Sequence, residues 1–142
     1  GAAGVTGAAG PCKLPTTRGQ VLVAEVSVVV PRPRDYVVVD APLPAGFEPI
    51  DPGQRSGAAW LKQLDRVESF GPEPGRQLDV HRDLRDDRVV FMIDHLPIGL
   101  YRFRFLVRAI TKGEFALPPA RVEAMYAPEN FGTTTFCTVE VQ

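Results

Sequence analysis

The sequence lacks any apolar run of the roughly 20 residues that a membrane-spanning helix requires. It also lacks an excess of charge of one sign, because 16 Lys and Arg residues balance 17 Asp and Glu residues, for a net charge of -1. Proteins that bind nucleic acid usually carry basic surfaces that neutralise phosphates. We therefore expect no nucleic-acid partner and no direct insertion into a membrane.

Motifs for nucleophilic or phosphate chemistry are also missing. None of the three serines lies in a G-x-S-x-G motif, and no glycine-rich loop opens a helix. The start of the chain, GAAGVTGAAG, lacks the positive and apolar segments of a signal peptide. Because these residues are small and bury little surface, we expect a flexible linker over residues 1–12 and one domain over residues 13–142.

Cysteine is scarce, with Cys12 near one end of the sequence and Cys137 near the other. An even number of cysteines fits a disulfide in an extracytoplasmic protein, and two free or buried thiols fit the same sequence. Cys137 shares a face with Val139 and Val141, so its side chain should point inward. Of these alternatives, we predict the Cys12–Cys137 disulfide.

Glycine and proline are abundant, with 13 and 14 residues, and they cluster between valine-rich segments. In VLVAEVSVVV, residues 21–30, the even-numbered positions are apolar, which is the period of a half-buried strand. In LYRFRFLVRAI, residues 100–110, aromatic and aliphatic side chains should face the core while Arg102, Arg104 and Arg108 face water. These patterns predict an all-β protein.

Five further segments are candidate strands: 36–40, 78–84, 87–94, 120–126 and 133–141. Together with the two strands above they make about seven strands separated by turns. This number favours an antiparallel two-sheet β-sandwich of the immunoglobulin-like kind, and a closed barrel is the competing architecture. Residues 51–76 are harder to interpret. Trp60, Leu64 and Val67 have helical spacing, but Pro and Gly flank them closely, so a short helix and a loop are equally compatible.

The histidines and aspartates are the candidates for a metal site. His81, His95 and Asp94 could in principle converge as ligands of a metal-dependent hydrolase, together with the carboxylates of RDLRDDR, Asp83, Asp86 and Asp87. Adjacent residues of one strand point to opposite faces, however, so Asp94 and His95 cannot chelate one ion together. We favour solvated roles for both histidines and ion pairing between the aspartates and the interleaved arginines, with no metal and no cofactor.

Met125 and Tyr126 are two large side chains side by side, just before a proline-containing loop. Met125 shares a strand face with Glu123, while Val122, Ala124 and Tyr126 share the other. Packing in the core is one interpretation of Met125. Trp60 and Tyr126 could also stack on sugars, as in a carbohydrate-binding or adhesion module of an extracytoplasmic protein.

Two segments carry a family resemblance: DYVVVDAPLPAGFEPID, and RDLRDDRVVFMIDHLPIGLYRFRFLVRAITKGEFALPPARVEAMYAPENFG. The linked features are PLPAGFE, RDDRV, G-x-Y leading to RA, G-x-F-x-x-PP and EAMY-x-PE-x-x-G, in that order. With them the chain resembles the C-terminal macroglobulin-like domain of the bacterial alpha-macroglobulins. The resemblance covers about residues 19–141.

This resemblance implies an immunoglobulin-like sandwich at the end of a large periplasmic protein, often lipid-anchored, that inhibits a broad range of endopeptidases. Such proteins trap a protease after it cuts a bait segment, and they attach to it through an internal thioester. The thioester needs a cysteine followed closely by Glu-Gln, and neither CKLP nor CTVE provides that motif. The resemblance therefore implies a domain that is not an enzyme.

In these relatives the terminal domain packs on the thioester domain, so the resemblance implies that Met125 and Tyr126 help to shield the thioester from water. Its partners would be that thioester and the neighbouring macroglobulin-like domains of the parent protein, with target proteases reached through the parent. The sequence departs from the family pattern at Ala127, where Asp is common, and at Phe131, in a loop that is usually more polar.

Overall fold

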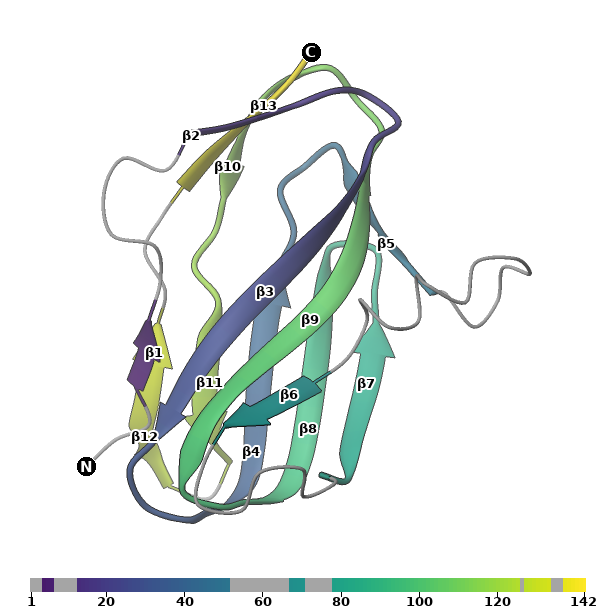
Figure 1. The fold of residues 1–142 in the computed structure, drawn as a ribbon. Helices are drawn as coiled ribbons and strands as arrows, with labels where there is room; N and C mark the ends of the chain where they lie inside the picture. Colours follow the sequence, from purple (N-terminus) through teal and green to yellow (C-terminus); the bar gives the residue numbers. More distant parts are fainter. Residues whose placement is uncertain (1–3, 7–12, 52–66, 71–77, 126, 134–136) are drawn as a thin grey trace.

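A computed structural model describes residues 4–6, 13–51, 67–70, 78–125, 127–133 and 137–142 (Figure 1). Within these ranges the chain forms strands, turns and loops, and it has no helix and hence none that could cross a membrane. The all-β prediction is confirmed. Most of the segment for which a short helix was considered lies outside the described ranges, and its described part, Val67–Phe70, is a strand.

The described residues contain thirteen strands. Their bounds, in chain order, are β1 (Gly4–Thr6), β2 (Lys13–Thr16), β3 (Val21–Val30), β4 (Arg34–Pro42), β5 (Phe47–Ile50), β6 (Val67–Phe70), β7 (Val80–Leu84), β8 (Arg88–Leu96), β9 (Gly99–Ala109), β10 (Gly113–Leu117), β11 (Arg121–Ala124), β12 (Ala127–Thr133) and β13 (Cys137–Val141). The long strands correspond to the segments that the sequence predicted. The added ones are mostly strands of three to five residues, which are too short to show a period.

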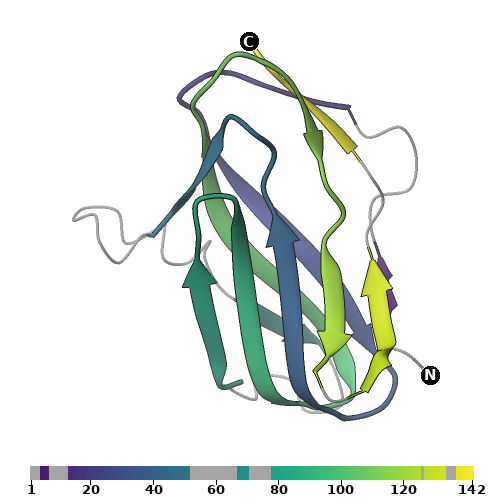
Figure 2. The ribbon, with the colours of Figure 1, turned by 180° about the vertical axis from the view of Figure 1, so that it is seen from behind.

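Two five-stranded antiparallel sheets face each other and form the expected β-sandwich (Figures 1 and 2). One sheet has the order β1-β3-β9-β5, with β6 also paired to β9, and the other has the order β12-β11-β4-β8-β7. The described pairings leave these sheets separate, so they do not form the closed barrel that was the alternative. A three-stranded sheet, β10-β13-β2, lies at one end, and its β13–β2 pair is parallel.

The core lies between the two five-stranded sheets and follows the predicted alternation. Val26, Val28 and Val30 of β3 are buried, as are the inward-facing residues of β9 from Tyr101 to Ala109. The ring centroids of Phe91 on β8 and Phe103 on β9 lie 5.2 Å apart, between the two sheets. Their burial provides the apolar contact that holds the two sheets together.

The outward face of β9 is less solvated than its arginines suggested. The Arg104 side chain is only 19% exposed, and its guanidinium lies 2.9 Å from Glu25 of β3 and 2.6 Å from Glu68 of β6. Hydrogen bonding to Glu25 raises the pKa of Arg104 above its ordinary value. The sequence could not show this because β6, which brings Glu68 to Arg104, pairs with β9 over a long sequence separation.

The N-terminal segment differs in one place from the linker expected over residues 1–12. Gly4–Thr6 forms β1, which pairs antiparallel with the edge of β3 from Val29 to Ser27. β1 also lies beside β12 of the facing sheet (Figure 1). Backbone pairing needs no large side chains, which is why small residues can provide an edge strand here.

Candidate functional site

Met125 lies at the tip of the β11–β12 hairpin. Ala124 of β11 pairs with Ala127 of β12, so residues 125–126 alone connect the two strands. Val122 and Ala124 are buried, whereas Met125 is 52% exposed. Met125 follows the last residue of β11 and points outward, so it does not pack in the core of this domain. Tyr126 lies outside the described residues.

Tyr36 of β4 lies directly beside Met125. The backbone N–H of Met125 donates a hydrogen bond of 2.8 Å to the carbonyl oxygen of Tyr36. Among the described residues, Tyr36 is the only non-glycine residue with a positive φ, 55°, and its side chain is 49% exposed. A bulky side chain in this left-handed conformation costs roughly 1–3 kcal/mol, and such strain often marks functional sites. Sequence reasoning missed Tyr36, because YVVVD is an ordinary strand pattern.

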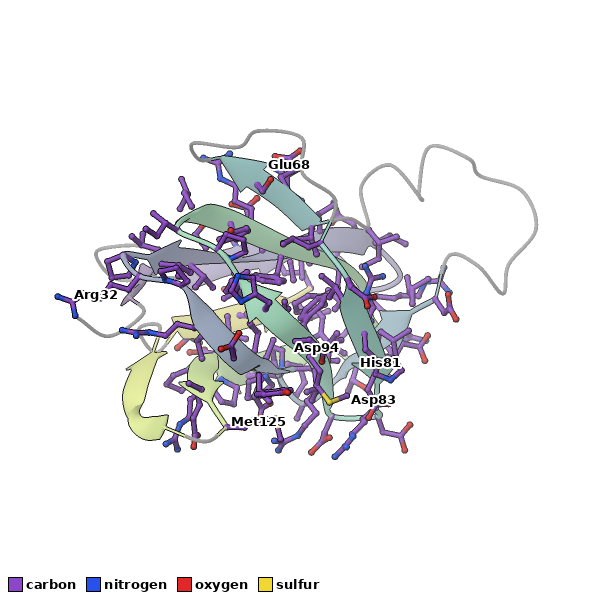
Figure 3. All side chains as sticks on the ribbon, turned by 90° about the horizontal axis from the view of Figure 1, so that it is seen from below. Arg32, Glu68, His81, Asp83, Asp94 and Met125 are labelled. Atoms are coloured by element: carbon purple, nitrogen blue, oxygen red, sulfur yellow. The ribbon has the colours of Figure 1, made fainter. Side chains whose placement is uncertain are left out.

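The end of the sandwich around Met125 gathers exposed apolar side chains. Six large hydrophobic residues are exposed among those described, and four of them, Val29, Tyr36, Ile98 and Met125, are near the β3–β4, β8–β9 and β11–β12 connections. Figure 3 views this end, with Met125 at its margin and Arg32 projecting away from the body. We call these three connections, together with Val29 and Tyr36, the Met125 end.

The two histidines lie on neighbouring strands and have different partners. His81 on β7 pairs with Met92, whereas His95 on β8 pairs with Asp35, and its Nδ1 lies 2.7 Å from the Asp35 carboxylate. Both histidines are exposed, which agrees with solvated roles. Among the described residues, no three His, Cys, Asp or Glu side chains are grouped so that they could hold a metal ion. Trp60, the other candidate for sugar stacking, lies outside those residues.

The RDLRDDR segment forms the β7–β8 hairpin, and its charges pair as predicted. Arg85 lies 2.9 Å from Asp83, and Arg88 lies 2.9 Å from Asp40 of β4 and 3.3 Å from Asp87. Hydrogen bonding to Asp87, with the nearby charge of Asp40, raises the pKa of Arg88 above its ordinary value. These carboxylates therefore have structural roles in a tight turn.

The predicted Cys12–Cys137 disulfide lies outside the described part of the structure. Cys137 begins β13, but its side chain and all of Cys12 lie outside the described structure. Their sequence neighbours are described, and Lys13 of β2 pairs with Thr138 of β13 in parallel register. The disulfide stays a prediction.

Comparisons with known proteins agree with this geometry. Residues 3–129 match the family model of the bacterial alpha-2-macroglobulin MG10 domain. An alpha-2-macroglobulin homolog of Nostoc sp. is 38% identical over 116 residues, which are 82% of this chain and 6% of the relative.

Two solved structures have the same fold. The crystal structure of Salmonella alpha-2-macroglobulin reacted with methylamine superposes with a TM-score of 0.65 and 26% identity, covering 97% of this chain and 9% of its own. The native conformation of Escherichia coli alpha-2-macroglobulin, solved by cryo-electron microscopy, has a TM-score of 0.69 and 21% identity, covering 99% of this chain and 9% of its own. The chain thus spans less than a tenth of the length of each of these relatives.

Proposed function

The chain belongs to the MG10 domains of the bacterial alpha-2-macroglobulins, and we propose that it is a non-catalytic domain that shields a thioester in a protease-trapping protein. The partner would be the thioester-bearing domain of the same polypeptide, with the neighbouring macroglobulin domains around it. Proteases would be reached only through the whole protein, because this chain lacks a cysteine followed closely by Glu-Gln.

The observation that carries the proposal is the exposure of Met125 at the tip of a two-residue turn. An apolar side chain in this position adds nothing to the core of its own domain, but it can cover a reactive group on a neighbour. Methionine suits that role because its thioether is flexible and apolar. The adjoining apolar residues of the Met125 end would widen the covered area.

Shielding follows from the chemistry of the thioester. An amine or water that attacks the acyl carbon takes the acyl group, and the cysteine sulfur leaves as a thiol. Exclusion of water by an apolar cover slows that attack, and movement of the cover after bait cleavage would expose the acyl carbon to a nucleophile of the protease. The Salmonella relative was crystallised after reaction with methylamine, a small amine of the kind that such a cover would delay.

The experiment compares thiol release by methylamine in the full-length polypeptide that contains this chain. Met125→Ala should speed the release several-fold. A tenfold faster release would correspond to an activation free energy lower by about 1.4 kcal/mol. A matched control is Val23→Ala, because Val23 is 43% exposed on β3, in the half of that strand away from the Met125 end. Equal release rates for Met125→Ala and the wild type would contradict the shielding role.

The proposal includes an extracytoplasmic location, periplasmic as in the proteins that this chain resembles. There the parent would meet attacking proteases, and a disulfide between Cys12 and Cys137 could persist. Fractionation of cells that make the full-length protein tests this part. Recovery of the protein only in the cytoplasmic fraction would contradict it.

A further inference from the structure

β6 is a short strand of four residues, Val67–Phe70, and among the described strands it pairs with β9 alone. Val67 lies opposite Phe103 of β9 and packs against the core, while Glu68 lies on the outward face of the sheet (Figure 3). On its other side, β9 pairs with all ten residues of β3. Backbone pairing therefore holds β6 less firmly than β3, and its side chains matter more.

Arg104 of β9 joins β6 to the sheet through Glu68. Its Nη1 lies 2.6 Å from Oε1 of Glu68, and its Nε lies 2.9 Å from Oε2 of Glu25 on β3. The Arg104 and Glu68 side chains are only 19% and 20% exposed, so water and salt screen this pair less than a pair at the surface. Removal of one partner of such a pair leaves the other charge poorly solvated, which makes the loss costly.

We propose that β6 is a detachable edge strand and that the Arg104–Glu68 pair is its latch. Detachment would leave β9 with unpaired N–H and C=O groups over residues 100–103, and groups of this kind can pair with another extended strand. The latch therefore decides whether this edge of the sheet is closed or open. Glu68 and Met125 lie on opposite sides of the sandwich, so the latch is independent of the proposed shielding function (Figure 3).

Hydrogen–deuterium exchange of the 142-residue chain tests the latch. Glu68→Gln keeps the size of the side chain and removes its charge. We expect the amides of β6, and those of β9 that pair with it, to exchange roughly tenfold faster, with no change in β3. The matched control is Glu25→Gln, which removes a charge from the other side of the same arginine, where the longer pairing with β9 holds β3. In this control β6 should exchange within about twofold of the wild type.

Arg104→Gln should accelerate the exchange of β6 as much as Glu68→Gln does, and the double variant should add little, because each change breaks the same pair. Equal exchange of β6 in the wild type and in Glu68→Gln would overturn the latch. Faster exchange in Glu68→Gln that spreads to β3 would also overturn it, since the whole fold and not one strand would then be opening. An acceleration of β6 in Glu25→Gln as large as in Glu68→Gln would remove the specific role of the Arg104–Glu68 pair. If Arg104→Gln does not fold, Glu68→Gln and its control decide the test.

Discussion

The two ends of the sandwich form their connections in different ways. At the end opposite Met125, Gly46 has a φ of 85°, and its carbonyl oxygen accepts hydrogen bonds from the N–H groups of Ile110 and Thr111. The N–H of Leu43 donates a 2.8 Å hydrogen bond to the backbone carbonyl oxygen of Asp87, which ties the β4–β5 connection to the β7–β8 hairpin. We call this the Gly46 end. Its left-handed residues are glycines, and Arg88 pairs there with Asp40 and Asp87.

The Met125 end differs from the Gly46 end in its left-handed residues and in its exposed side chains. It contains a left-handed tyrosine, Tyr36, in addition to Gly99, which has a φ of 156°. It exposes Val29, Ile98 and Met125, whereas the Gly46 end exposes Ile110. The glycine turn and ion pairs of the Gly46 end stabilise the fold, whereas the proposed function assigns the exposed residues of the Met125 end to contact with another domain. Substitutions at the two ends should therefore affect stability differently.

The largest effect should come from the cysteines, if they form the predicted disulfide. Loss of the disulfide in Cys137→Ser should lower the free energy of unfolding by about 2–4 kcal/mol in denaturant titrations. Cys12→Ser should cost the same, and the double variant should cost little more, because one bond is lost in each case. Two free thiols titrated in the unfolded, unreduced protein would contradict the disulfide.

Gly46→Ala should cost about 2 kcal/mol, because it combines left-handed strain with a steric clash. A Cβ at this position would lie 2.8 Å from two atoms of the Phe115 ring. The melting temperature should fall by several degrees. Phe115→Ala separates the two causes, since Gly46→Ala should cost less when the ring is absent. A full cost in the absence of the ring would assign the whole effect to backbone strain.

Tyr36→Gly should change stability in the opposite direction. Relief of strain at a φ of 55° should raise the free energy of unfolding by up to about 1 kcal/mol, since the greater flexibility of unfolded glycine offsets part of the gain. Thermal unfolding of the 142-residue chain measures this change. A loss of 1 kcal/mol or more would remove the contrast between the two ends.

The smallest effect should be that of Met125→Ala on the same chain. Because the side chain is 52% exposed, its truncation should change the free energy of unfolding by less than about 0.5 kcal/mol. A core methionine would cost about 2–5 kcal/mol in the same measurement. A large loss would place Met125 among the residues that hold the fold together.

The long strands could be predicted from sequence because burial alternates along them. Val26, Val28 and Val30 of β3 follow a period of two, and so do Phe103 and Phe105 of β9, the neighbouring strand in the same sheet. The same period placed Met125 on the outward face. Leu106 is an exception to this alternation. It lies between the core residues Phe105 and Val107 of β9, and it is itself fully buried. Its register partners are Val23 of β3 and Ile50 of β5, and β5 is a strand of four residues with no recognisable period.

The strained geometry at Tyr36 could not be predicted. A left-handed conformation is expected at glycine or asparagine, and YVVVD contains neither. The conformation arises where β4 meets β11 and β8, and these contacts join residues far apart in the chain. The family resemblance led to Met125 by its motif, and the structure was needed to find the residue beside it.

The parallel pairing of β2 with β13 has a mechanical consequence. The ladder runs from Lys13 and Thr138 to Thr16 and Val141, and continues where the N–H of Gln142 donates to Thr16 and that of Arg18 to Gln142. A force that pulls Lys13 and Gln142 apart acts along the strands, so it loads these hydrogen bonds together in shear instead of opening them one after another. If an attached domain moved and stretched the chain between these points, this pair would carry the load, and the rest of the sandwich would be loaded only after the pair yielded.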